Sequence, residues 1–202
     1  MNIRLCNIAI LSLAMAGCGT TSDIKPVSQP PSTQTAAVSI EAPPYASFNE
    51  VVVLDFVDGT DKSKIKAEKR LEYDEVMKVA VRNFADRIAA EIRKTGAYPT
   101  VSREPGEGEA LQISGVITRY AAGNALLRLF IGMGAGSSYF DATVDISRQS
   151  DAAKLGQVIV DKNSWGLGGA IAASQNVEGF TQGAAEKIAK QLAEGRVGVP
   201  KK

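Results

Sequence analysis

Apolar residues follow two different periods along the chain. The run from Val51 to Phe56 is β-branched and has the length of a strand, which predicts a central strand buried on both faces. Farther on, apolar residues recur three or four positions apart, the period of a helix with one buried face. They are Met77, Val81, Phe84, Ile88 and Ile92. Gly96 follows them and suits a left-handed helix end.

The polar side of this predicted helix carries opposite charges four residues apart, a spacing that favours ion pairs within a helix. The expected pairs are Asp74–Lys78, Arg82–Asp86 and Arg87–Glu91. A second helix is predicted near the end of the chain, with Gly195 as its last residue. Its apolar positions are Val177, Phe180, Ala184, Ile188 and Leu192.

Between the two helices the period changes to two. Apolar and polar residues alternate cleanly from Tyr139 to Ser147, which predicts a strand with one buried and one wet face. Further strands are expected at residues 98–103, 111–120 and 157–165, with a possible bulge at Gly115. The predicted order is β-α-β-β-β-β-α. It indicates an α/β fold: a two-layer sandwich whose mixed, mostly antiparallel sheet of about four to five strands has two helices on one face.

The N-terminus reads as an export signal. Arg4 precedes an apolar stretch, residues 8–16, that is too short to cross a membrane. Met15-Ala16-Gly17-Cys18 resembles a bacterial lipobox, which predicts that residues 1–17 are removed and that Cys18 is lipidated, with palmitate among its acyl chains. Ordinary secretion is the alternative, because Ala14-Met15-Ala16 also matches a cleavage site. Gly19 in place of an aspartate favours the outer membrane, with the domain facing the periplasm.

The segment after the cysteine is expected to be a tether. Residues 18–47 hold five of the eight prolines with many Ser, Thr and Gln, a composition that does not bury a core. A single domain is expected at residues 48–195, followed by a tail at 196–202. Loss of Arg4 changes 23 basic residues to 22, against 22 acidic ones, and a neutral chain has little attraction for nucleic acid.

A motif between the third and fourth predicted strands carries a family resemblance. Gly123-Asn124 is followed by Arg128, an apolar stretch and the pattern Gly-x-Gly-x-Gly-Ser at 132–137, which leads into the alternating strand. With Gly96-Ala97-Tyr98 at the end of the first helix, the chain resembles the bacterial lipoproteins of domain of unknown function 4410 over about residues 48–195. The resemblance implies an envelope lipoprotein and supplies no activity.

The same motif provides candidate contacts with a partner. Residues 125–131 are apolar except for one arginine, and a glycine-rich stretch follows. One interpretation is a short buried helix at the sheet edge. The other is an exposed apolar contact for an envelope protein or a second copy of the chain. The candidate residues are Leu127, Arg128, Phe130 and Met133.

Composition argues against catalysis. The 202 residues contain no histidine and two cysteines, which excludes histidine-dependent triads and histidine-ligated zinc. Ser63-x-x-Lys66 and Lys94-Thr95-Gly96 match fragments of penicillin-binding enzymes, but they lie in a charged run and at a helix end. Asp55, Asp58 and Asp61 surround a glycine without the spacing of a calcium loop. We therefore expect no catalytic residue, no metal and no cofactor.

The leading expectation is a non-catalytic, outer-membrane-anchored module for interaction or assembly in the envelope. The alternative is a periplasmic lipoprotein that binds a small ligand or peptidoglycan through the wet sheet face. Its candidate ligand residues are Tyr139, Asp141 and Thr143.

Overall fold

The computed structural model describes residues 24–25, 44–63, 65–123, 137–163 and 176–198. In chain order, its elements are β1 (Ile24–Lys25), β2 (Glu50–Val53), β3 (Val57–Asp58), the short 3₁₀ helix η1 (Ala67–Lys69), α1 (Arg70–Thr95), β4 (Thr100–Ser102), β5 (Leu111–Ala121), β6 (Tyr139–Arg148), β7 (Lys154–Asn163) and α4 (Val177–Val197).

All the strands belong to one mixed sheet in the order β1-β7-β6-β5-β2-β4, and β3 also pairs with β5. Strands β5, β6 and β7 form an antiparallel meander, whereas β2 runs parallel to both β4 and β5. The predicted mixed, mostly antiparallel sheet is confirmed. Among the described residues the sheet has seven strands, more than expected, because β1 and β3 are two-residue strands that composition does not reveal.

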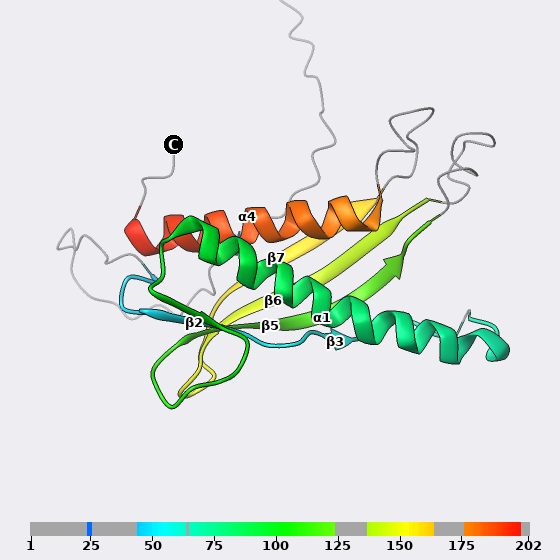
Figure 1. The fold of residues 1–202 in the computed structure, drawn as a ribbon, viewed down its shortest axis with the longest axis horizontal. Helices are drawn as coiled ribbons and strands as arrows, with labels where there is room; N and C mark the ends of the chain where they lie inside the picture. The colour runs from blue at the N-terminus through cyan, green and yellow to red at the C-terminus, as the bar shows by residue number, and fades with distance from the viewer. Residues whose placement is uncertain (1–23, 26–43, 64, 124–136, 164–175, 199–202) are drawn as a thin grey trace, which may run out of the picture.

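The two described α-helices, α1 and α4, lie side by side on one face of the sheet, as predicted, and the core fills the space between the two layers (Figure 1). Three aromatic rings form its centre: Phe84 of α1 lies 4.8 Å from Phe56 and 4.8 Å from Phe140 of β6. The two-layer α/β sandwich follows from this arrangement. Val51, Val52 and Val53 are fully buried, as expected for a central strand.

Helix α1 ends where the sequence indicates, because Gly96 takes a φ of 64° and donates its N–H to the carbonyl of Arg93. In place of the ion pairs expected along α1, Lys78 and Glu91 pair with residues three positions away in the same helix, and three other charged residues make contacts to neighbouring segments. These contacts are Asp74–Lys62, Asp86–Arg103 and Arg87–Glu178. Neighbouring segments bring these partners within reach, so the charges join α1 to the rest of the fold.

Two glycines have roles other than those predicted. Gly195 lies inside α4, which continues to Val197 and is capped by Gly198 at a φ of 69°. Gly115 pairs regularly with Val144, and the register shift of β5 lies between Ile117 and Arg119. Both glycines accommodate a buried ring: Phe56 over Gly115 and Tyr45 over Gly195.

The expected tether has structure at two places. Ile24 and Lys25 form β1 on the outer edge of β7, and Tyr45 is buried in the core beside α4. The expectation that residues 18–47 contribute nothing to the core is therefore wrong at Tyr45. Its ring packs against Gly195 of α4, where a Cβ atom would lie 2.5 Å from the ring.

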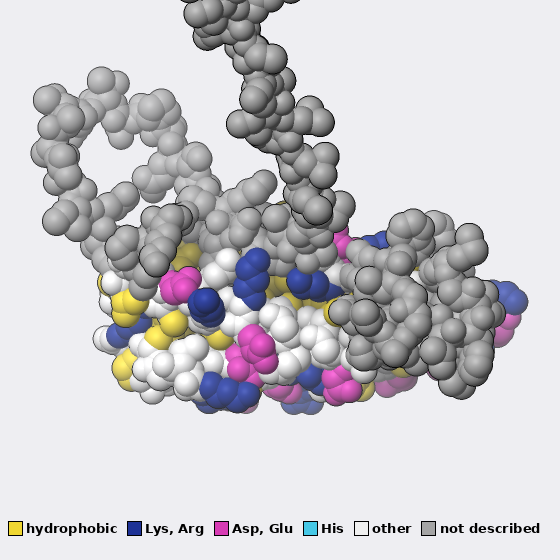
Figure 2. All heavy atoms as spheres, turned by 90° about the horizontal axis from the view of Figure 1, so that it is seen from above, with side chains coloured by type: hydrophobic (Ala, Val, Ile, Leu, Met, Phe, Trp, Pro, Cys, Tyr) yellow, Lys and Arg dark blue, Asp and Glu magenta, His cyan; other side chains and the backbone are white. Residues whose placement is uncertain are grey.

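Surface charge is mixed in sign. On the face seen in Figure 2, Lys and Arg side chains are interspersed with Asp and Glu side chains. No described helix combines the length and apolarity that crossing a bilayer requires.

Candidate functional site

The sheet face opposite the helices carries a row of apolar and methyl-bearing side chains. Val116 of β5 lies opposite Thr143 of β6, and Thr143 lies opposite Ile159 of β7. Val57 of β3 extends the row, since it pairs with Val116. Ile159 is 46% exposed and Val57 is 61% exposed, while the two central residues are half-buried. We call these four residues the apolar row.

A charged cluster borders the apolar row. The Arg119 Nε atom lies 2.6 Å from Oδ2 of Asp141, and its Nη2 atom lies 3.9 Å from Oδ1 of Asp161. The guanidinium also stacks 4.4 Å from the ring centre of Tyr139. The sequence candidates Tyr139 and Asp141 thus share one cation, whereas the third candidate, Thr143, lies in the apolar row.

Arg119 and Asp161 escaped the sequence reasoning, although alternation on β7 signals an outward Asp161. The register shift between Ile117 and Arg119 brings Arg119 opposite Asp141. A bulge of this kind re-aims a side chain, and its position depends on strand pairing. We therefore find no signal in a single sequence that would have located it.

Asp141 is the unusual member of the Arg119 cluster. Burial raises the pKa of its carboxyl group, Arg119 opposes that effect, and the nearby Asp161 adds to it, so that the pKa is raised overall. Its Oδ1 atom is buried and has no hydrogen-bond partner in the part of the chain that the structure describes. An uncompensated acceptor of this kind favours a donor group from outside.

A second carboxylate that is paired with a cation lies beyond the apolar row, on the side away from Arg119. Asp145 of β6 is 2.7 Å from the Lys154 Nζ atom and accepts a hydrogen bond of 2.8 Å from the Gln157 side chain. Each of the two aspartates of this strand is therefore paired with its own cation. The outer face presents an apolar band between two polar bands.

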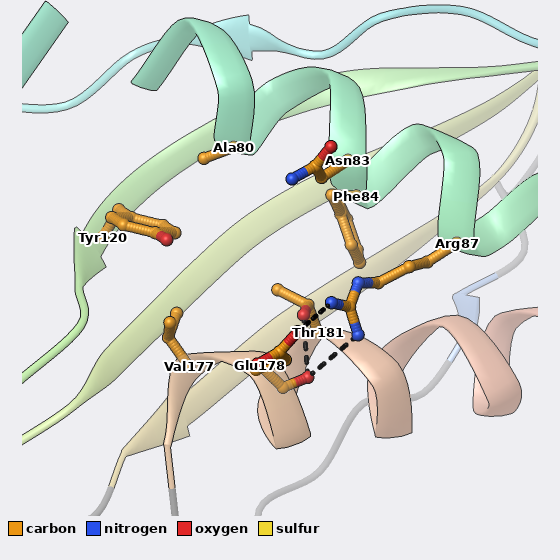
Figure 3. A pocket seen from close by; sticks show the side chains of 8 residues that line it. All are labelled: Ala80, Asn83, Phe84, Arg87, Tyr120, Val177, Glu178 and Thr181. Carbon is orange, nitrogen blue, oxygen red and sulfur yellow. Dashed lines mark hydrogen bonds and ion pairs between the residues drawn. The ribbon is translucent and has the colours of Figure 1, made fainter. Parts of the chain in front are cut away.

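A separate cavity of about 220 Å³ lies on the helix side of the sheet, between α1, the end of β5 and the first turn of α4 (Figure 3). Phe84 and Tyr120 contribute aromatic rings to its lining. Arg87 lies at the α4 side, with its Nη2 atom 2.7 Å from the Glu178 carboxylate. Burial, reinforced by Glu178, raises the pKa of Tyr120, which keeps its hydroxyl protonated. The cavity is small and its one cation is already paired.

The carboxylates considered as calcium ligands have separate partners. Asp55 pairs with Arg103. Asp61 accepts a hydrogen bond of 2.9 Å from the backbone N–H of Ser63, and Asp58 pairs with a lysine that also contacts α1. Lys62 lies 2.9 Å from Asp58 and 2.6 Å from Asp74. Among the described residues, no three acidic or cysteine side chains form a group suited to a metal ion.

Several sequence candidates lie outside the described residues. They are Cys18, Leu127, Arg128, Phe130 and Met133. Ala121 pairs with Tyr139, and Tyr139 pairs with Asn163. The connections 124–136 and 164–175 therefore both begin at the same end of the sheet.

The fold and its outer face define a two-layer α/β domain with an apolar band on an open sheet. The family model "Domain of unknown function (DUF4410)" matches residues 51–168, which is more than half of the chain. The chain belongs to this family, and the resemblance found in the sequence is confirmed.

Two solved structures are similar to the chain at low identity. A variant PelC dodecamer from Paraburkholderia phytofirmans is 13% identical, with a TM-score of 0.46, covering 84% of this chain and 98% of its own. A Xanthomonas campestris protein that matches the DUF330 family model is 11% identical, with a TM-score of 0.45, covering 78% of this chain and 91% of its own. Similarity at this level carries no conclusion about function. No curated protein matches the sequence.

Proposed function

We propose that this DUF4410 protein is a non-catalytic lipoprotein of the outer membrane that makes protein contacts in the envelope, with itself or with another envelope protein. The observation that carries the proposal is the apolar row, Val57, Val116, Thr143 and Ile159, on the sheet face opposite the helices. The lipobox ending at Cys18 supports the anchor, and two or more acyl chains give stable attachment.

The surroundings of the apolar row suit a protein interface. Interfaces commonly have an apolar centre from which unpaired charges are excluded and a polar rim. Here the row lies between the Arg119 cluster and the Asp145–Lys154 pair. Because Arg119 pairs with Asp141 and Lys154 pairs with Asp145, these four charges stay paired when the face is covered.

Site-specific photo-crosslinking in cells tests this proposal. A crosslinking residue replaces Ile159 in the apolar row, and a matched variant carries it at Glu75, which is exposed on α1. We expect a protein adduct from position 159 and none from position 75. The addition of Val57→Asp should abolish the adduct, because it places a charge in the apolar band. Absence of any protein adduct from position 159 would contradict the proposal.

The same experiment at Leu127 and Phe130 tests the sequence-based contact candidates. We propose that these two positions also meet a partner protein. Adducts formed only with lipid at both would contradict that part of the proposal, whatever position 159 shows.

One observation favours an alternative function, the binding of peptidoglycan or a small polar ligand. The buried Oδ1 atom of Asp141, uncompensated among the described residues, could accept a hydrogen bond from a hydroxyl or amide group, and Tyr139 lies in the same cluster. Sedimentation with purified peptidoglycan tests this function. Binding lost in Asp141→Ala and retained in Asp145→Ala would favour it. No binding by the unaltered protein would eliminate peptidoglycan as the ligand.

A further inference from the structure

Strand β1 joins the N-terminal segment to the outer edge of β7. Ile24 lies opposite Val158 and Lys25 lies opposite Gln157, in antiparallel register. The next described residue is Pro44, where the domain begins. The pairing with β7 therefore attaches the chain to the domain about 20 residues before Pro44. The pairing changes which part of the domain is connected most closely to Cys18.

The direction of β1 indicates where the chain comes from. Because β1 and β7 are antiparallel, the N-terminal end of β1 points toward the Asn163 end of β7. Val158 and Asn163 are five steps apart, about 17 Å along a strand. Cys18 and Ile24 are six steps apart, at most about 21 Å.

We propose that β1 shortens the connection between the lipidated Cys18 and the domain. The β7 edge of the sheet, at its Asn163 end, then faces the membrane surface. This inference rests on the proposed lipidation of Cys18, and the partner is the lipid surface itself. The opposite edge, β4, lies four strand spacings away from β7, about 19 Å. The loop containing Glu107 lies before β5, at the other end of the strands.

Without β1, the connection would leave the domain free to rotate. A flexible coil from Cys18 to Pro44 has a root-mean-square length of roughly 30 Å, comparable to the domain, and selects no face. The two arrangements therefore differ in one measurable respect, the depth of the two ends of the sheet relative to the bilayer.

Fluorescence quenching on vesicles measures that depth. The mature lipidated protein is reconstituted in phosphatidylcholine vesicles that contain a headgroup-labelled quencher lipid, with one fluorophore on Asp161→Cys or on Glu107→Cys. Cys18 is blocked by its lipid and Cys6 is removed with the signal, so the introduced thiol is labelled uniquely. We expect stronger quenching at position 161 than at position 107.

Two matched insertions distinguish a connection that is held at β1 from one that is flexible between Cys18 and Pro44. An inserted coil of about 12 Gly and Ser residues has by itself a root-mean-square length of roughly 19 Å. Placed after Ser22, ahead of β1, it should abolish the difference between the two probes. Placed after Gln29, beyond β1, the same insertion should leave that difference unchanged.

The outcomes distinguish this inference from the function on which it rests. If the protein bound vesicles but quenching was equal at both positions, or both insertions had equal effects, β1 would not orient the domain. If the protein bound vesicles no better than Cys18→Ala, the proposed anchoring would fail, and the inference with it.

Discussion

Gly115 allows the Thr143 carbonyl of β6 and the Phe56 ring to lie close against β5. A Cβ atom at this position would overlap the Thr143 carbonyl oxygen and lie 2.7 Å from the Phe56 ring. The first neighbour is backbone of the adjacent strand, which cannot move without breaking the pairing of β5 with β6. The glycine is required here for space.

We expect Gly115→Ala to lower the free energy of unfolding by about 3 kcal/mol, as overpacking of a rigid site does. Gly183→Ala is the matched control, because this glycine lies inside α4 and no atom beyond the adjacent residues and nearby helix backbone lies within 4 Å of the added carbon. It should stabilise the protein by about 0.5–1 kcal/mol through helix propensity. Urea unfolding measures both variants. A Gly115 variant as stable as the control would contradict the packing argument.

A second residue-scale prediction concerns Asp58 and pH. Burial alone would raise the pKa of its carboxyl group, but hydrogen bonds from Lys62 and Thr60 outweigh it and lower the pKa below the ordinary 3.8. A lowered pKa in the folded state means that the stabilisation is present above about pH 4 and is lost as the pH falls through the folded value. Asp58→Asn should thus destabilise the protein at pH 7 and matter progressively less below pH 4.

Unfolding by urea between pH 7 and pH 2.5 measures this difference. In a Lys62→Gln background the effect of Asp58→Asn should depend less on pH, since its main cationic partner is gone. A constant difference between the Asp58 variant and the unaltered protein across this range would contradict the prediction.

At the scale of elements, α4 depends on the residue that caps its start. The Asn176 side chain accepts a hydrogen bond of 2.8 Å from the N–H of Gly179, one of the donors that a helix start leaves unpaired. Asn176→Ala should cost about 1 kcal/mol of stability, and Asn176→Ser should restore most of it. Thermal unfolding compares the three proteins. Equal loss in the Ala and Ser variants would show that the cap is not the cause.

The elements differ in how far the sequence predicts them. Helix spacing and Gly96 are local signals, so α1 was recognised together with its end. The run from Val51 to Phe56 was predicted as one strand, yet β2 ends at Val53 and pairing resumes at Val57 in β3. Between them Phe56 turns into the core over Gly115, a contact with a residue almost sixty positions away.

The candidate site was predictable only in part, because it too depends on contacts between residues that are far apart in the sequence. Alternation on β6 identified Tyr139, Asp141 and Thr143 as outward residues on a face that no described helix covers. The residues that give this face its character, Arg119 and Ile159, depend on the register of three strands. Register is a property of paired strands, which periodicity along one segment does not contain.

At the scale of the whole molecule, the N-terminal and C-terminal ends of the domain are in direct contact. Tyr45 donates its backbone N–H to the Gly195 carbonyl, and its ring packs on that glycine. Arg196 donates to the Phe48 carbonyl and to the Asn49 side chain, and stacks 4.9 Å from the Tyr98 ring. Tyr45 and Arg196 both lie outside residues 48–195, the domain expected from the sequence, and both contact its core.

This closure predicts different stabilities for two fragments. A fragment of residues 48–195 loses the burial of Tyr45, worth about 2–3 kcal/mol, and the stacking of Arg196 on Tyr98, worth about 1 kcal/mol. We expect it to melt roughly 10 °C below a fragment of residues 44–198. Tyr45→Ala and Arg196→Ala in the longer fragment should each reproduce part of the loss. Equal melting temperatures for the two fragments, measured by circular dichroism, would contradict the view that these contacts close the fold.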